Sequence, residues 1–175
     1  MSSDLVLVTG ASGYVAGHCV LRLLHDGYRV RGTLRSLKRA GEVRQWLTHA
    51  RGGIDPGDAL SFAEAELTKP NGWDAAMDGV RYVLHVASPI PSTVPKDPDD
   101  LIVPAREGTL NVMRAASRVS VQRVVQTSSA SAISYGRDGL RPHWQHGEGQ
   151  VRPHGDGAAG WPCSSGRGRE SNLLL

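Results

Sequence analysis

Apolar residues in the first 136 positions recur with two alternating spacings. Short apolar or alternating runs, which are typical of strands, occupy residues 5–9, 28–34, 60–67, 80–86 and 121–127. Segments with helical spacing of apolar residues lie between them, at residues 15–26, 40–50, 73–77 and 99–120. Strands that alternate with helices favour right-handed crossovers, and hence a parallel sheet. The pattern therefore predicts an α/β fold, doubly wound, with strand order 3-2-1-4-5.

The ends of the predicted helices carry recognisable signals. The first helix should bury an apolar stripe and end at Gly27, because glycine tolerates the left-handed conformation that closes a helix. The stripe consists of Val15, Cys19, Val20, Leu23 and Leu24. Asn71 is placed to cap the short helix at 73–77. Cys19 is thus expected to be a core thiol rather than a reactive one.

After Gly136 the alternating pattern stops. Residues 137–175 are rich in Gly, Arg, His and Pro and contain no lysine and no isoleucine. Such a segment buries too little apolar surface to offset the entropy of ordering it, so we expect an irregular, disordered tail after a domain at residues 1–136. An out-of-frame translation from a GC-rich gene, a truncated gene or a disordered interaction tail would each give this composition. The histidines at 143, 146 and 154 with Cys163 match no standard zinc spacing, so no metal site is expected.

The turn after the first apolar run is the feature that most constrains function. It reads Val-Thr-Gly-Ala-Ser-Gly-Tyr-Val-Ala-Gly-His at residues 8–18. Gly10 permits a tight strand-to-helix turn, and Gly13 removes the side chain where a phosphate must approach the main chain. The following helix directs its N-terminal amides and the positive end of its dipole at the anion. This arrangement is the dinucleotide-binding fingerprint of a Rossmann-type fold.

Charge and hydropathy exclude several other classes. The formal net charge is +3, but no five like charges occur in a row, so we expect no nucleic-acid partner. No run approaches the ~20 apolar residues of a membrane span. The N-terminus lacks the charged region of a signal peptide. Two cysteines give no disulfide framework. We therefore expect a cytoplasmic protein that acts, if at all, on a small molecule.

These residues resemble the extended short-chain dehydrogenase/reductase family. The closer likeness is to its dihydroflavonol-4-reductase-like branch, among the NAD-dependent epimerases/dehydratases. The resemblance covers residues 1 to about 136 and rests on six stretches. They are VTGASGYVAGH at 8–18, VRGTLRS at 30–36, AEL at 65–67, VLHVASP at 83–89, EGTLNVMRAA at 107–116 and RVVQTSSAS at 123–131.

The resemblance implies a set of cofactor contacts. The diphosphate would lie on the glycine-rich loop, which comprises Thr9, Gly10, Ser12, Gly13, Tyr14 and Val15. Arg35 and Ser36 stand where an acid would grip the ribose 2′-hydroxyl of NAD, with Lys38 and Arg39 directly behind them. Cations at this point favour the 2′-phosphate of NADP. The remaining contacts are Glu66 and Leu67 around the adenine, Val86, Ala87 and Ser88 along the ribose and nicotinamide, and Thr127 beside the nicotinamide. His85 is expected to pack rather than to act as an acid or base.

The implied chemistry is hydride transfer to a carbonyl, or from a hydroxyl, of a small molecule. Ser129 would hydrogen-bond the substrate oxygen. The family also uses a Tyr-x-x-x-Lys pair, in which the lysine lowers the pKa of the catalytic tyrosine. No lysine follows Lys96 and no tyrosine follows Tyr135, so the pair is missing from these 175 residues. Three functions stay open: an NADP-dependent reductase, a sugar-nucleotide epimerase or dehydratase, and a non-catalytic NADP-binding fragment. The sequence does not indicate the oligomeric state.

Overall fold

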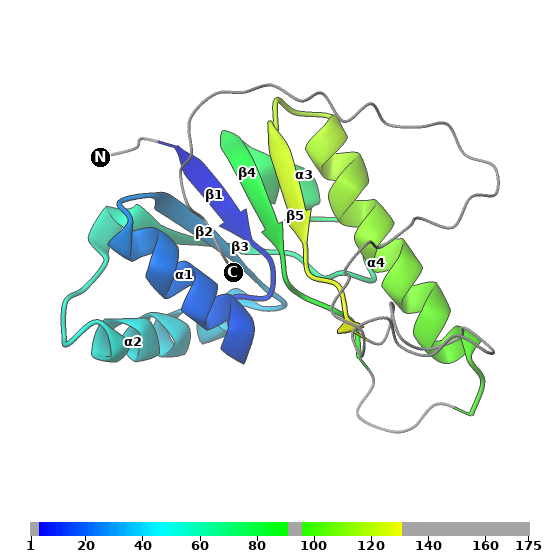
Figure 1. The fold of residues 1–175 in the computed structure, drawn as a ribbon, viewed down its shortest axis with the longest axis horizontal. Coiled ribbons are helices and arrows are strands. Elements are labelled where there is room, and N and C mark those ends of the chain that lie inside the picture. The colour runs from blue at the N-terminus through cyan, green and yellow to red at the C-terminus, as the bar shows by residue number, and fades with distance from the viewer. Residues whose placement is uncertain (1–3, 91–95, 131–175) are drawn as a thin grey trace, which may run out of the picture. The chain divides into compact units, whose positions relative to one another are not determined.

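The structure, a computed structural model, describes residues 4–90 and 96–130. The expected tail from residue 137 lies outside the described residues, as does its boundary with the first domain. The strands are β1 (Leu5–Val8), β2 (Arg29–Leu34), β3 (Leu60–Glu64), β4 (Val80–His85) and β5 (Arg123–Gln126). The α-helices are α1 (Tyr14–His25), α2 (Ala40–Ala50), α3 (Trp73–Met77) and α4 (Asp99–Ser117) (Figure 1).

The five strands form one parallel sheet in the order β3-β2-β1-β4-β5. This confirms both the predicted fold class and the predicted topology. Because every strand runs in the same direction, all their carboxyl ends lie at one edge of the sheet. The connection after β1 leads to β2 on one side, whereas the connection after β4 leads to β5 on the other side, which opens a crevice at the sheet edge between β1 and β4.

Helices cover both faces of the sheet, as alternation along β1 requires. Leu5 and Leu7 pack in one apolar cluster with α3 and α4, whereas Val8 packs in a second cluster with α1 and α2. The first cluster is centred on Trp73, Met77 and Val112, and the second on Val20 and Leu47. All five of these side chains are buried to 1% exposure or less. Figure 1 shows α1 and α2 together on one side of the sheet.

The first turn of α1 differs from the predicted stripe. Val15 is 55% exposed, because this turn extends past the strand ends, where Val15 lines a cavity instead of the core. The helix buries Ala16, Gly17, Val20 and Leu24. Cys19 is half-buried against the α1–α2 cluster, near the core position expected for it, and burial raises the pKa of its thiol.

Glycines end α1 and begin α3. Gly27 has φ +84°, and Tyr28 N–H donates to Leu23 O at 3.0 Å, so the predicted stop is confirmed as a left-handed helix end. The expected cap at Asn71 is wrong. Gly72, with φ +88°, is the N-cap of α3, and no side chain caps it. The chain enters this helix through a left-handed residue, for which glycine is favoured.

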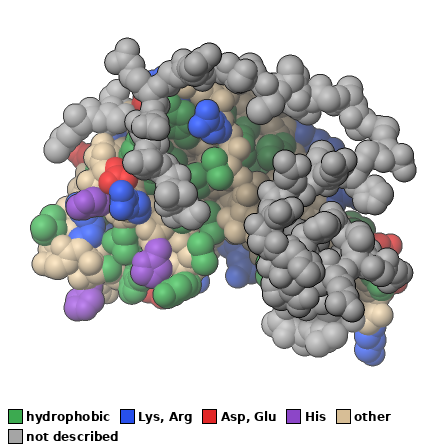
Figure 2. Space-filling model, viewed as in Figure 1, with side chains coloured by type: hydrophobic (Ala, Val, Ile, Leu, Met, Phe, Trp, Pro, Cys, Tyr) green, Lys and Arg blue, Asp and Glu red, His purple; other side chains and the backbone are tan. Residues whose placement is uncertain are grey.

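Charged side chains are scattered over the surface. Figure 2 shows Lys and Arg as separate spots on the described part of the visible face rather than as one basic patch. Two arginines pair with carboxylates close to them in the sequence, Arg22 with Asp26 at 2.9 Å and Arg106 with Glu107 at 3.2 Å. No helix in the described ranges is long and apolar enough to cross a bilayer.

Candidate functional site

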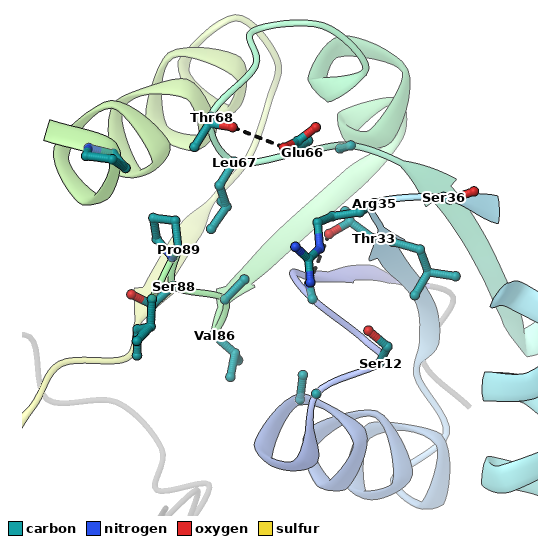
Figure 3. A pocket seen from close by; sticks show the side chains of 18 of the residues that line it. Ser12, Thr33, Arg35, Ser36, Glu66, Leu67, Thr68, Val86, Ser88 and Pro89 are labelled. Atoms are coloured by element: carbon teal, nitrogen blue, oxygen red, sulfur yellow. Dashed lines mark hydrogen bonds between the residues drawn. The ribbon is translucent and has the colours of Figure 1, made fainter. Parts of the chain in front are cut away.

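A cavity of about 820 Å³ lies at the carboxyl ends of the strands. Four segments build most of its wall: the loop and first turn of α1, the end of β2, the segment after β3 and the segment after β4 (Figure 3). Ligands of open α/β sheets bind in the crevice beyond the strand ends, at the point where the connections diverge. The cavity therefore lies where the fold predicts a ligand.

The glycine-rich loop forms one wall. Gly10 has φ +69°, and a Cβ added there would lie 2.8 Å from the Ala87 Cβ. Its N–H donates to Thr33 Oγ1 at 3.0 Å, while Gly13 N–H donates to Gly10 O at 2.8 Å. The helix that follows has no acidic residue in its first turn and no side-chain cap. Its first amides and positive dipole end are thus available to an anion.

The end of β2 supplies positive charge. Figure 3 shows the Arg35 side chain directed into the cavity, which Thr33 and Ser12 also line. Ser36 and Arg39 also line the cavity, but Lys38 does not. Arg39 donates to Glu42 at 3.1 Å from both Nε and an Nη; this pairing raises the pKa of Arg39 and lowers that of Glu42. Among the described residues, the cations that line the cavity are therefore Arg35 and Arg39.

The segment after β3 is held from two helices. Trp73 of α3 donates from Nε1 to Glu66 O at 3.2 Å and to Lys69 O at 3.0 Å. Asn111 of α4 donates to Leu67 O at 2.8 Å. The Glu66 carboxylate pairs with Lys69 at 2.7 Å, and this lysine lowers the pKa of Glu66. Glu66 and Leu67, the expected adenine contacts, thus line the cavity on a fixed segment.

The segment after β4 is held from beneath by Thr9. Val86, Ala87 and Ser88 line the cavity, whereas Thr9 is fully buried. Its Oγ1 accepts hydrogen bonds from Val86 N–H and Ala87 N–H, both at 3.0 Å. The same oxygen lies 2.9 Å from His85 Nδ1. Burial lowers the pKa of the His85 imidazole. Thr9 therefore supports the cavity wall instead of forming part of it.

Two expected residues follow β5 and stand outside the lining. Thr127 and Ser129 are exposed, and neither lines the cavity. The backbone N–H of Thr127 donates to His85 O at 3.0 Å, which ties the end of β5 to the end of β4. The structure thus brings the loop, β2, β3 and β4 residues together around one cavity, while Lys38, Thr127 and Ser129 lie apart from it.

Several lining residues were not anticipated from the sequence. They are Ala16, Thr33, Leu34, Ala65, Thr68, Trp73, Pro89, Ile90, Asp100 and Pro104. Ser36 and Arg39, which the sequence placed beside Arg35 and Lys38, do line the cavity. Nothing in the sequence indicates that Asp100 and Pro104 line the cavity, because only the packing of α4 brings them there.

The comparisons with known proteins agree with this geometry. Residues 6–154 match the sequence model of the NAD dependent epimerase/dehydratase family. The chain belongs to this family. A putative anthocyanidin reductase from Ginkgo biloba is 44% identical over 133 residues, covering 74% of this chain and 37% of that protein. The cinnamoyl-CoA reductase CAD2 of Medicago truncatula is 40% identical over 134 residues, covering 75% of this chain and 40% of that protein.

Solved structures of reductases are also similar to this chain. Yeast methylglyoxal/isovaleraldehyde reductase Gre2, complexed with NADPH, matches with a TM-score of 0.60 and 32% identity over 73% of this chain and 38% of that one. Vestitone reductase from alfalfa matches with a TM-score of 0.57 and 29% identity over 74% of this chain and 37% of that one. The chain spans about two fifths of the length of the relatives it matches.

The residues present fit an NAD(P)-type dinucleotide. A Cβ at Gly10 would fill the space between the loop and the β4 segment. The first amides of α1 are left to an anion, and two arginines stand at the β2 end of the same cavity. No group of three or more His, Cys, Asp or Glu within the described residues could hold a metal ion. The site is therefore suited to binding and orienting a phosphorylated ligand through backbone amides and guanidinium groups.

Proposed function

We propose that this chain binds NADP as the cofactor part of a carbonyl reductase. The observation that carries the proposal is the placement of Arg35 and Arg39 beside the glycine-rich loop around one cavity. Guanidinium groups at the end of the second strand favour a 2′-phosphate over a free 2′-hydroxyl. Reductase relatives support the class of reaction, and the Gre2 structure holds NADPH.

Each wall of the cavity has a role in this proposal. Gly10, Ser12, Gly13, Tyr14 and Val15 hold the diphosphate against the start of α1. Arg35 contacts the 2′-phosphate, Glu66 and Leu67 bracket the adenine, and Val86, Ala87 and Ser88 orient the ribose and nicotinamide. When bound, the nicotinamide supplies or accepts the hydride. Thr127 and Ser129 would serve the nicotinamide and the substrate oxygen from the end of β5.

A single substitution tests the preference for NADP. We expect Arg35→Ala to weaken NADPH binding by tenfold or more, the value of about one charge-assisted hydrogen bond, while NADH binding changes little. Isothermal titration calorimetry with NADPH and with NADH measures the two dissociation constants. Arg22→Ala is the matched control, because Arg22 lies on α1 outside the cavity and pairs with Asp26. Equal losses for NADPH and NADH would contradict a phosphate contact at Arg35.

A second candidate function is NADP binding without turnover by these 175 residues. It is favoured by the sequence itself, in which no lysine follows Lys96 and no tyrosine follows Tyr135. An assay of NADPH oxidation with a panel of small aldehydes and ketones separates the two candidates. Oxidation that is abolished by Ser129→Ala would support the reductase. Binding without oxidation would support the second candidate.

A further inference from the structure

A buried polar pair lies beneath the cavity wall and has no part in the proposed cofactor contacts. Thr9 on the β1 side is 0% exposed and His85 at the end of β4 is 3% exposed. The two residues are 76 positions apart in the chain, with 2.9 Å between Thr9 Oγ1 and His85 Nδ1. Burying polar groups costs free energy unless each one is hydrogen-bonded. The position of the proton between Thr9 and His85 therefore matters for the stability of this buried pair.

The hydrogen bonds around Thr9 determine where its proton points. A hydroxyl has one proton to donate and two lone pairs to accept with. Both lone pairs are taken, because Val86 N–H and Ala87 N–H each donate to Thr9 Oγ1 at 3.0 Å. The remaining proton can therefore only be donated to His85 Nδ1. It follows that Nδ1 is an acceptor and that the neutral ring carries its proton on Nε2.

We propose that His85 is a positioning residue for the cofactor site, acting through Thr9. By accepting the Thr9 proton, the imidazole keeps both lone pairs of Oγ1 on the amides of Val86 and Ala87. We call this arrangement of Thr9, His85 and the two amides the clasp. The inference rests on the proposed function, because the segment that the clasp holds is the wall along which the ribose and nicotinamide would lie.

The clasp acts where the glycine-rich loop packs closely against the β4 segment. A Cβ at Gly10 would lie only 2.8 Å from the Ala87 Cβ, so the separation of the loop from the β4 segment depends on where Ala87 stands. The His85 carbonyl also accepts from Thr127 N–H at 3.0 Å. One residue thus links the end of β4 to β1 through its side chain and to β5 through its backbone.

The first test needs no cofactor and no substitution. In protein with ¹⁵N-labelled histidine, long-range ¹H–¹⁵N spectra distinguish a protonated from an unprotonated ring nitrogen. We expect Nδ1 of His85 to be unprotonated and Nε2 protonated at neutral pH. A His85 ring protonated on Nδ1 would overturn the proposal, because the Thr9 proton would then have no acceptor.

The second test compares two replacements of His85. In His85→Asn the amide oxygen lies the same number of bonds from the backbone as Nδ1 and can accept the Thr9 proton; in His85→Phe no acceptor remains. We expect amide hydrogen exchange at Val86 and Ala87 to be about tenfold faster in His85→Phe than in the parent, and close to the parent in His85→Asn. The Gly10 amide, which donates to Thr33, is the internal control. Equal exchange in all three proteins would overturn the proposal.

Cofactor affinity gives the functional consequence. NADPH should bind about tenfold more weakly to His85→Phe and within about threefold of the parent to His85→Asn. Equal weakening in both variants would contradict a role through Thr9. If the parent binds no NADPH, the proposed function fails, whereas the tautomer and exchange measurements still decide whether the clasp exists. If His85→Phe does not fold, the tautomer measurement still decides it, because the tautomer is read on the unmodified chain.

Discussion

At the residue scale, Gly10 combines a left-handed backbone conformation with a close contact across the cavity. It adopts φ +69°, and a Cβ there would also lie 2.8 Å from the Ala87 Cβ. Gly79 has nearly the same backbone conformation, with φ +68°, but a Cβ added to it meets nothing within 4 Å. Comparing substitutions at Gly10 and Gly79 therefore separates the free-energy cost of a left-handed backbone from the cost of the contact with Ala87.

We expect Gly10→Ala to lower the free energy of unfolding by about 2–5 kcal/mol, since a left-handed alanine costs about 1–2 kcal/mol and an overpacked contact about 1–3 kcal/mol. Gly79→Ala should cost only about 1–2 kcal/mol, the conformational part. Urea unfolding of the two variants and the parent measures the difference. Equal losses at the two positions would show that Ala87 moves aside freely and that the crevice is not tight at this point.

Hydrogen bonds between site residues that are far apart in the chain were the hardest feature to predict from the sequence. The glycine-rich loop was recognisable because its spacing is local, and Gly10, Gly13 and their neighbours do line the cavity. The role of Thr9 was not, since its partner His85 is 76 positions away. Sequence patterns report on which face a residue lies, but they do not report which buried polar groups meet.

At the element scale, strand and helix identities followed from periodicity, whereas short irregular segments did not. Helix α2 begins and ends where its apolar spacing predicted. Just before it, residues Leu37–Arg39 form a 3₁₀ turn, which has three residues per turn rather than 3.6. This turn helps to determine which of Lys38 and Arg39 reaches the cavity, and nothing in the spacing of apolar residues indicated it.

Helix α3 is short, but it fixes one wall of the cavity through Trp73. This side chain is 1% exposed, and its Nε1 donates to the carbonyls of Glu66 and Lys69. Trp73→Phe keeps an aromatic ring and removes both bonds, so we expect a loss of about 1–3 kcal/mol in the free energy of unfolding and weaker NADPH binding. Chemical denaturation and a cofactor titration measure the two effects.

Tyr82→Phe is the matched control for that prediction. Tyr82 lies on β4 and lines no part of the cavity, and its hydroxyl donates to Gln122 Oε1 at 3.3 Å in an exposed hydrogen bond. Its replacement should change stability by less than about 1 kcal/mol and leave NADPH affinity unchanged. If the Trp73 and Tyr82 variants lost affinity equally, the segment from Glu66 to Lys69 would not depend on α3 for its position.

At the scale of the whole molecule, a buried neutral histidine makes stability depend on pH. Burial lowers the pKa of His85 in the fold, whereas in the unfolded chain the imidazole has its ordinary pKa of about 6.5. As the pH falls below that value, the unfolded chain binds a proton that the folded chain resists, so the free energy of unfolding must decrease. Above it both states are neutral, and His85 adds no pH dependence.

The measurement is urea unfolding of the parent and of His85→Asn from pH 8 to pH 5. Taking the difference between the two proteins cancels groups that titrate alike in both, such as the paired carboxylates. We expect a constant difference above about pH 6.5 and a progressive loss of stability of the parent relative to His85→Asn below it. A difference that stayed constant, or that favoured the parent in acid, would mean that His85 accepts a proton within the fold. That result would contradict the inference, drawn from the Thr9 hydrogen bonds, that the folded His85 ring is neutral.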